Sequence, residues 1–398
     1  MDELLENLNT ILQEKEEKIL PENIKKDVEI FGVTGTLGDE NNNEESEYNA
    51  LLECPLNRTT FTISLWITEI KEVDMAGVTS MSSAFANFRV LKKISKILNT
   101  AAVTNFYRAF YDCKELEEIP FLDTSSATSM SGIYSGCSKI TEAPDLDMSN
   151  VTSVNEMFYG CTSLEKIPKL NVTKCTSLSG MFYHCAKLET ISLFDTSTIT
   201  SMRNMFTNCS GLKELPNFNT SNVTDMYQTF HNCSSLVRVT NLDVSKVTTM
   251  YSIFYNCTSL EELSNFDTSN VTNMQNMFTG CTKLTTIPAL NADKVNTMYS
   301  MFANHTTLTN FGGLINLGKA FTQTSNNYSA YQLPLNTCNQ LTHDSLINII
   351  NGLYDLNLTY DVANGGTLYT QSLYIGSTNK SKLTAEEIAL ATAKRMDC

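Results

Sequence analysis

The sequence has little positive charge and no long apolar run. Its 28 Lys and Arg residues stand against 43 Asp and Glu residues, which gives a formal net charge of −15. Nucleic acids and anionic lipid surfaces bind clustered Lys and Arg side chains, so neither is an expected partner. No apolar stretch approaches the roughly 18 residues of a membrane helix, so we expect no membrane insertion. The hydrophobic share, 42%, is nevertheless enough for a folded core.

Residues and motifs that carry chemistry are also scarce. The chain has four histidines, and the motifs of zinc proteases, dithiol enzymes and nucleotide-binding loops are absent. His184 stands beside Cys185, but neighbours on a turn diverge, so no nucleophilic pair is expected. A glycan hydrolase would need two carboxylates across a cleft, and no insertion of that kind interrupts the chain. We expect no enzyme, no metal and no cofactor.

Export signals are missing as well. The N-terminal segment carries Asp2, Glu3 and Glu6, the reverse of the basic start of a secretory signal. We find no lipobox-like cysteine and no C-terminal sorting signal. The sequence therefore predicts a soluble chain without an export signal of its own.

The cysteines reveal an internal period. Eight of the twelve are separated by steps of 24 residues, and we call them the Cys ladder. The ladder consists of Cys113, Cys137, Cys161, Cys185, Cys209, Cys233, Cys257 and Cys281. Leu or Ile stands three residues after each ladder cysteine, and Phe or Tyr three residues before it. A fixed period of this length predicts a stacked solenoid, whose coils bury their apolar residues against their neighbours.

Within one period, the pattern reads C-x-x-L-x-x-[IL]-P-x-[LF]-[DN]-x-S-x-V-T-x-M-x-x-M-F. The L-x-x-[IL] stretch predicts a short strand, and S-x-V-T-x-M a second extended segment. M-x-x-M-F has the i, i+3, i+4 spacing of a helical or 3₁₀ turn. The predicted fold is an α/β repeat solenoid, leucine-rich-repeat-like, with short strands plus helical turns. About ten coils stacked at about 4.8 Å would span roughly 48 Å.

The Cys ladder predicts buried free thiols rather than disulfides. In a dry, regular core a thiol behaves as a small apolar filler. Phe88 and His305 take the cysteine position in the flanking coils, and a position that accepts Phe is a packing site. Cys175 aligns with Val151 and Val223, which predicts that it too is core. The cysteines therefore give little information about compartment.

The flanking segments divide the chain into four parts. These are an N-terminal helix and small attachment module (1–39), a polar linker (40–47), the solenoid (48–310) and C-terminal capping units (311–398). In residues 1–20, apolar residues fall at the a/d-like positions of a two-heptad coiled-coil stem. A helix packed on its own chain would show the same pattern.

The 24-residue register fades after Phe302, where a cap is predicted. Two helices are expected, in residues 341–356 and 383–396, each after a short strand. Thr342 and Thr384 are the expected N-caps, and Glu387 completes a capping box at the second. Solenoids need such a cap to close the open end of the core.

The repeats resemble the BspA-like leucine-rich repeats of bacterial surface proteins. Residues 266–278 read FDTSNVTNMQNMF and continue to Cys281 and Leu284. The resemblance covers about residues 60–310. Residues 19–37, ILPENIKKDVEIFGVTGTL, resemble an attachment module in tail and baseplate proteins of phages and prophages of Gram-positive bacteria.

These resemblances imply a non-enzymatic recognition protein. The first reading is a phage or prophage tail- or baseplate-associated receptor-binding protein, carried on the virion, because free-standing surface relatives have the signal peptide and wall anchor that are missing here. It implies a bacterial surface glycan or protein as receptor, docking on other tail or baseplate proteins through residues 1–39, and a homo-oligomer, with a trimer favoured. The alternative is a BspA-like adhesin or scaffold at the bacterial cell surface.

Aromatic side chains form a candidate binding stripe. They stand just after the Met column or four residues further on, so helical spacing would place them on one face. The stripe consists of Tyr107, Tyr111, Tyr159, Tyr183, Tyr227, His231, Tyr251, Tyr255 and Tyr299. It would suit stacking on sugar rings or a protein interface, although the same residues could merely cover the edge of the core. Its densest part is predicted at Tyr227, His231, Tyr251 and Tyr255.

Two further surfaces stay open to either a binding or a structural interpretation. A column of Asp or Asn, including Asp123, Asp147 and Asn171, could bind calcium or accept backbone N–H bonds at a repeated corner, and the second is favoured. Mixed charge on the strand wall, as at Glu165 and Lys166, is typical of either a solvated face or a recognition surface.

Overall fold

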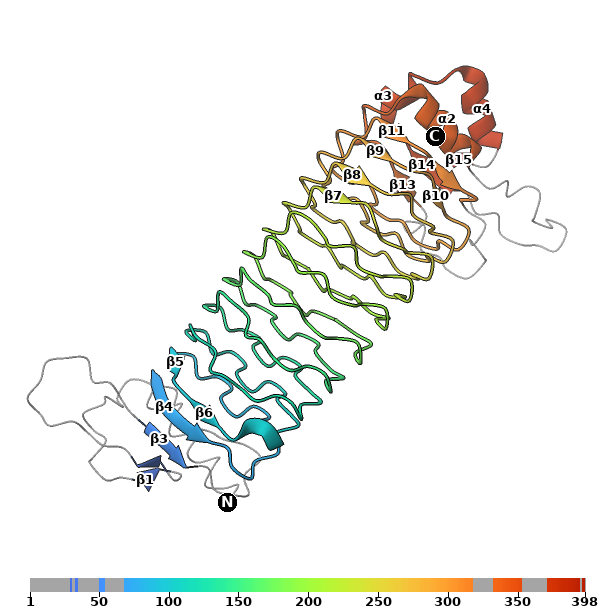
Figure 1. Cartoon of the computed structure of the whole chain (residues 1–398). Coiled ribbons are helices and arrows are strands. Elements are labelled where there is room, and N and C mark those ends of the chain that lie inside the picture. Colours follow the sequence, from blue (N-terminus) through green and yellow to red (C-terminus); the bar gives the residue numbers. More distant parts are fainter. Residues whose placement is uncertain are drawn as a thin grey trace, which may run out of the picture.

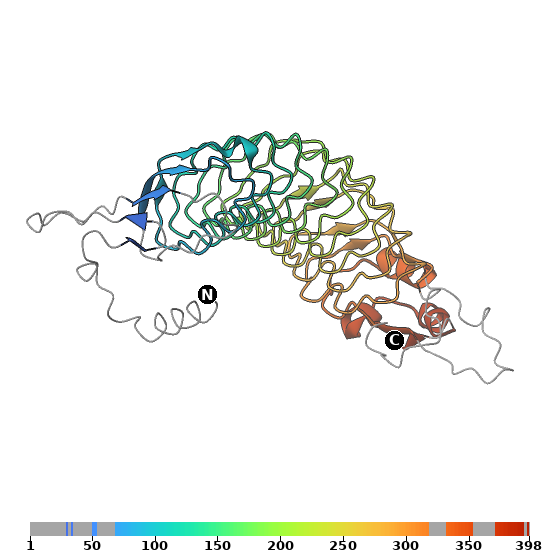
Figure 2. The same cartoon turned by 90° about the horizontal axis from the view of Figure 1, so that it is seen from below.

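The computed structural model describes residues 68–317, 332–352 and 371–393, together with strand segments at 29–30, 33–34, 50–53 and 396–397. They form an elongated stack of coils that runs from the N-terminal strands to the C-terminal helices (Figure 1). The stack bends along its length (Figure 2). The predicted stem, the linker and most of the attachment module lie outside the described residues.

Successive coils pair through short parallel strands, and the predicted solenoid is confirmed. The pairs are β4 (Glu69–Asp74) with β5 (Lys93–Ile94) and β6 (Ile97–Leu98), β7 (Arg238–Val239) with β8 (Glu262–Leu263), β9 (Thr286–Ile287) with β11 (Asn310–Phe311), and β10 (Leu290–Asn291) with β12 (Leu314–Ile315). One short 3₁₀ helix, η2, covers Thr100–Ala102. In the middle of the rod, single bridges such as Ser201 with Asp225 keep the 24-residue offset. The sequence period is therefore the structural period.

Three short strands extend the first sheet. β1 (Glu29–Ile30) pairs antiparallel with β2 (Val33–Thr34), and β2 pairs antiparallel with β3 (Ala50–Glu53). β3 pairs parallel with β4. Two strands of the predicted attachment module, β1 and β2, are thus continuous with the sheet of the solenoid.

The M-x-x-M-F segments form consecutive β-turns, which corrects the predicted helical turns. In one such segment, the Met205 N–H donates to the Met202 carbonyl (3.1 Å), while Asn204 has a φ of 54°. A helix does not contain this left-handed conformation. The Phe110 N–H donates to the Ile133 carbonyl of the next coil at 2.8 Å. A helix would use such N–H groups internally, so hydrogen bonding between coils excludes it.

The core consists of columns that run along the rod. The aromatic residues three before each ladder cysteine stack with centroid separations from 5.5 to 5.9 Å. All ladder cysteines and Cys175 are buried and free, as predicted. Each ladder thiol also donates to a backbone carbonyl of the preceding coil; Cys209 Sγ lies 2.9 Å from the Phe182 oxygen. Burial raises the pKa of the Cys209 thiol, so it stays protonated and able to donate.

The described residues of the C-terminal end form three parallel strands and three helices. These are β13 (Gln332–Pro334), β14 (Gln371–Tyr374), β15 (Met396–Asp397), α2 (His343–Asn351), α3 (Gly376–Lys380) and α4 (Ala385–Ala393). The Thr342 hydroxyl accepts from the Ser345 N–H, as its predicted N-cap role requires. At α4, the Glu387 N–H donates to Thr384 and the Thr384 N–H to the Glu387 carboxylate, which confirms the capping box.

The coil register continues beyond the point where the sequence period fades. The Thr309 N–H donates to the Thr285 carbonyl (3.0 Å), and the Thr342 N–H donates in the same way to Thr309 (2.9 Å). Thr342 lies four residues after Cys338, as Thr309 lies four after His305. Cys338 therefore continues the Cys ladder, and a longer inserted segment hides its period.

Candidate functional site

The predicted stripe divides into two columns along the surface. Column A holds the residues just after the Met column, and column B holds those four positions later. Column A consists of Tyr107, Ser131, Asn155, Ser179, Arg203, Tyr227, Tyr251, Gln275 and Tyr299. Column B consists of Tyr111, Ser135, Tyr159, Tyr183, Thr207, His231, Tyr255, Thr279 and Ala303. Tyr107, Tyr159 and Tyr299 are exposed, and the other six stripe side chains are half-buried.

Neighbouring aromatic side chains in each column stack ring on ring. Tyr227 and Tyr251 lie 4.7 Å apart with an interplanar angle of 4°, and His231 and Tyr255 lie 4.6 Å apart at 7°. The rings are parallel because each repeats the position of its neighbour one coil earlier. Two stacked rings cover one face of each other, so each ring of such a pair has one face that its partner leaves uncovered.

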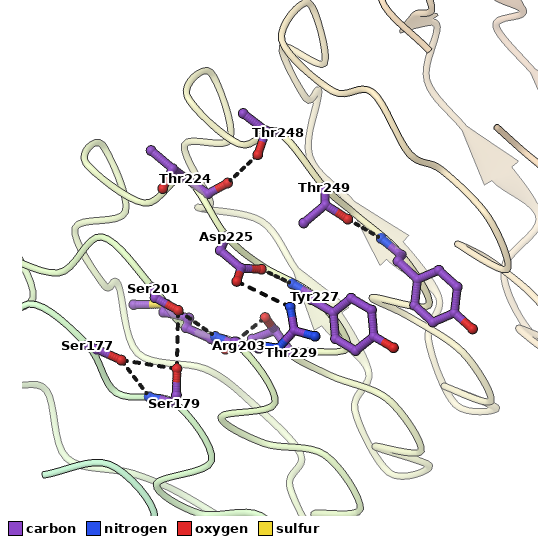
Figure 3. Close-up of polar contacts among 12 residues, drawn as sticks. Ser177, Ser179, Ser201, Arg203, Thr224, Asp225, Tyr227, Thr229, Thr248 and Thr249 are labelled. Atoms are coloured by element: carbon purple, nitrogen blue, oxygen red, sulfur yellow. Dashed lines mark hydrogen bonds and ion pairs between the residues drawn. The ribbon is translucent and has the colours of Figure 1, made fainter. Parts of the chain in front are cut away.

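Arg203 closes the other side of the Tyr227 ring, as Figure 3 shows. Its guanidinium carbon lies 3.8 Å from the ring centroid, and its Nη1 nitrogen pairs with the Asp225 carboxylate at 3.5 Å. The Asp225 carboxylate also accepts from the Tyr227 N–H at 2.9 Å. Sequence reasoning missed Arg203 and Asp225, although Arg203 stands one period before Tyr227. Both faces of Tyr227 are thus covered, and this ring supports the patch.

A network of hydroxyl groups lies beside Arg203 (Figure 3). Ser177 donates to Ser179 at 3.0 Å, and the Ser179 and Ser201 hydroxyl oxygens are 3.2 Å apart. On the outer edge, the Thr248 hydroxyl and N–H both bond to the Thr224 carbonyl. These polar side chains satisfy one another from coil to coil and leave the aromatic groups as the distinctive chemistry of this face.

The stripe falls into separate clusters rather than one continuous surface. Tyr159 and Tyr183 stack at 4.4 Å in the N-terminal half. Arg108, also missed from the sequence, lies beside Tyr107 and Tyr111, with its guanidinium carbon 5.3 and 4.9 Å from their centroids. Tyr299 stands apart from the Tyr227 cluster because Gln275 and Thr279 interrupt the columns.

The remaining candidate groups have structural partners. The His184 ring lies 2.8 Å from the Asn208 amide, and Cys185 is buried, so the two do not form a reactive pair. The carboxylates of the Asp/Asn column accept the N–H two residues later, as Asp147 does from Ser149 (2.9 Å), which lowers the pKa of Asp147. Residues 68–317, 333–352 and 375–393 contain no group of three His, Cys, Asp or Glu side chains that could hold a metal.

Charges on the strand wall pair between adjacent coils. Lys213 lies 2.6 Å from Glu189, and Lys166 lies 3.7 Å from Glu142. Pairing of this kind is typical of a solvated face, and exposed pairs contribute little stability. The helices in the described part of the chain are too short or too polar to span a bilayer.

Comparison with protein families identifies the repeats. The model of DUF285, described as a Mycoplasma protein of unknown function, matches residues 57–169, 141–238 and 237–332. Together these matches cover more than half of the chain. The chain belongs to the DUF285 family. No curated protein matches it.

Three of the solved structures similar to this DUF285 chain are bacterial leucine-rich repeat proteins. A leucine-rich repeat protein from Bacteroides ovatus is 17% identical, with a TM-score of 0.36 over 74% of this chain and 92% of that one. A leucine rich cell surface protein from Faecalibacterium prausnitzii is 19% identical, with a TM-score of 0.32 and coverages of 73% and 95%. A leucine-rich repeat protein from Eubacterium ventriosum is 17% identical, with a TM-score of 0.34 and coverages of 66% and 73%. None of these three is named as a phage protein.

Proposed function

We propose that this chain is a non-enzymatic recognition protein located at the bacterial cell surface. The aromatic columns of its solenoid bind a glycan or protein on the surface of bacterial cells. The observation that carries the proposal is the stacking of half-exposed aromatic rings along one surface. Rings held in register by the coils lose little conformational freedom on binding. The BspA-like pattern of the repeats supports a surface location. The phage-tail reading rests on residues 1–39, where only four residues are described, and gains no support from the described coils.

The contact surface should centre on Tyr251 and Tyr255 rather than on Tyr227. Each of these two rings is the last of its stack, because Gln275 and Thr279 follow one coil later. An aromatic ring at the end of a stack keeps one face that no other ring covers. Tyr227, by contrast, lies between Arg203 and Tyr251.

Binding of the labelled full-length chain to intact bacterial cells tests the proposal. We expect Tyr251→Ala combined with Tyr255→Ala to reduce cell binding at least tenfold, with a melting temperature close to that of the parent. Lys213→Ala on the strand wall, which breaks only an exposed ion pair, is the matched control and should bind normally. Unchanged binding by the double variant, or a parent chain that binds no cells, would contradict the proposal.

A further inference from the structure

Column B has a gap in the N-terminal half of the rod. Tyr111 and Tyr159 stand two periods apart, and Ser135 occupies the position between them. Where this column has aromatic side chains in neighbouring coils, their rings stack at 4.4 and 4.6 Å. The small Ser135 side chain does not fill this position, but it is itself buried, with 3% of its surface exposed, and the Arg108 side chain passes over Gly132 beside it. The open space in this column therefore lies between Arg108 and Tyr159, which both line it.

The floor beside this gap also lacks side chains. In three later coils the residue before the ladder cysteine is Asn, and these residues, Asn208, Asn232 and Asn256, bond to one another at 2.7 and 3.1 Å. Near the gap the same position holds Gly136 and Gly160. A Cβ at Gly160 would meet only Gly136 atoms, at 3.6 and 3.7 Å. The absent side chains leave a hollow of about 330 Å³.

One wall of the hollow is an aromatic ring that is held in place. Tyr159 lines the hollow, and Tyr183, in the following coil, covers the opposite side of its ring at 4.4 Å. The open face of Tyr159 therefore points toward the Ser135 side. Tyr111 lines the hollow from the preceding coil. A disc-shaped group in this space would lie parallel to the coils.

The rim of the hollow carries groups of both charges. Arg108 reaches across to Glu156, with 3.5 Å between nitrogen and carboxylate, and its Nε is buried without a hydrogen-bond partner among the described residues. Asp112, on the same rim, pairs with Arg89 at 2.8 Å. A hydrocarbon group here would cost these groups their hydration, whereas hydroxyl groups both donate and accept.

We propose that this hollow binds one pyranose ring of a carbohydrate. The ring stacks on the open face of Tyr159. Its hydroxyl groups donate to the Glu156 and Asp112 carboxylates, and its oxygen atoms accept from the Arg108 guanidinium. The inference rests on the proposed recognition function and gives it a ligand class, at a place distinct from the Tyr251 and Tyr255 patch. The hollow would bind a single sugar unit, whereas Tyr251 and Tyr255 would contact the surface around it.

The test uses the full-length chain and soluble trisaccharides of N-acetylglucosamine, of β-1,4-linked glucose and of galacturonic acid. Isothermal titration is expected to show saturable binding of at least one of them. Ser135→Tyr, which supplies the absent ring, should weaken that binding at least tenfold. Thr279→Tyr makes the same kind of change in column B far along the rod and should bind like the parent. Thermal unfolding of both variants verifies that they fold.

The outcomes separate the two proposals. The sugar site is contradicted if the parent chain binds none of the trisaccharides, or if Ser135→Tyr binds the sugar as tightly as the parent. If the parent still binds cells in that case, the proposed recognition function is unaffected. If Ser135→Tyr does not fold, Tyr159→Ala takes its place, because it removes the stacking face and adds no bulk. Sugar binding that is insensitive to Tyr159→Ala likewise overturns the proposal. A parent chain that binds neither cells nor sugars would contradict both the recognition function and the sugar site.

Discussion

At the scale of single residues, the Cys ladder shows how one position serves two needs. The thiol is small enough for a crowded column and also donates to a carbonyl of the preceding coil, as Cys209 does to Phe182. Alanine would fill the column but leave the carbonyl with one bond fewer. The repeated choice of cysteine therefore follows from packing together with hydrogen bonding, and no disulfide is involved among the described cysteines.

His305 interrupts this ladder and should make the fold sensitive to acid. It is buried, neither ring nitrogen has a hydrogen-bond partner among the described residues, and burial lowers its pKa to about 4. The unfolded chain binds a proton at this site near pH 6.5 and the folded chain only near pH 4, so stability falls as the pH drops through that window. The limit of the effect is about 3 kcal/mol.

Urea unfolding at pH 7.5 and pH 4.5 measures this effect. His305→Cys restores the ladder residue and should lose much less stability between the two pH values than the parent. His231→Gln is the control. Burial lowers the pKa of His231 as well, though less strongly, so this variant should lose nearly as much stability between the two pH values as the parent. Equal losses in the parent and in His305→Cys would show that His305 is not the acid-sensitive group.

At the scale of the element, the turn segments depend on residues that tolerate a left-handed backbone. Each coil has two such positions, and Asn or Gly fills many of them, as at Asn208, Asn232 and Gly136. Asn is favoured among non-glycine residues because its short polar side chain bonds locally. These residues allow consecutive β-turns to form while alternate N–H groups remain free to bond to the next coil.

Substitutions at Asn232 separate backbone strain from side-chain bonding. Its φ is 59°, and its side chain bonds to Asn208 and Asn256. Asn232→Ala should cost about 2–4 kcal/mol, from the left-handed backbone and the lost bonds. Asn232→Gly should cost about 1–2 kcal/mol, because glycine removes the bonds but adopts this φ readily. Denaturant unfolding gives both values, and a glycine variant less stable than the alanine variant would refute this account.

At the scale of the whole molecule, the rod is a sum of neighbouring contacts. Strand pairs, aromatic stacks, the Asn bonds and the thiol bonds all join adjacent coils. In such a repeat architecture, stability is close to a sum of coil and interface contributions. Removing one complete period should therefore bring equivalent surfaces together.

Deletion of residues 210–233 tests this property. The deletion joins Cys209 to Ser234, which follows Cys233 in the parent chain. Every column therefore keeps its 24-residue spacing. We expect a folded rod with a circular dichroism spectrum like that of the parent and a slightly lower melting temperature. Deletion of residues 210–221 is the control, because half a period moves polar residues into the apolar columns and should abolish cooperative unfolding. An unfolded 24-residue deletion would contradict nearest-neighbour stacking.

The sequence alone determined the solenoid, its period and its buried thiols. It could do so because the same packing requirement recurs in every coil, so the same residue type appears at each equivalent position, as at Cys209, Cys233 and Cys257. The helix caps at Thr342 and Thr384 were predictable for a different reason, since a cap depends on residues only three positions apart.

Only the tertiary structure decided the turn type and the exposed faces of the candidate site. Apolar residues at i, i+3 and i+4 fit a helix and a run of β-turns equally well. The β-turns form because they leave backbone N–H groups free to hydrogen-bond to the next coil. The stripe residues were predicted by position, but which ring faces stay open depends on the residue one coil away, as Arg203 covers Tyr227 and Tyr183 covers Tyr159. The hollow beside Ser135 arises from side chains that are missing in adjacent coils, and their absence becomes a space only when the coils are stacked.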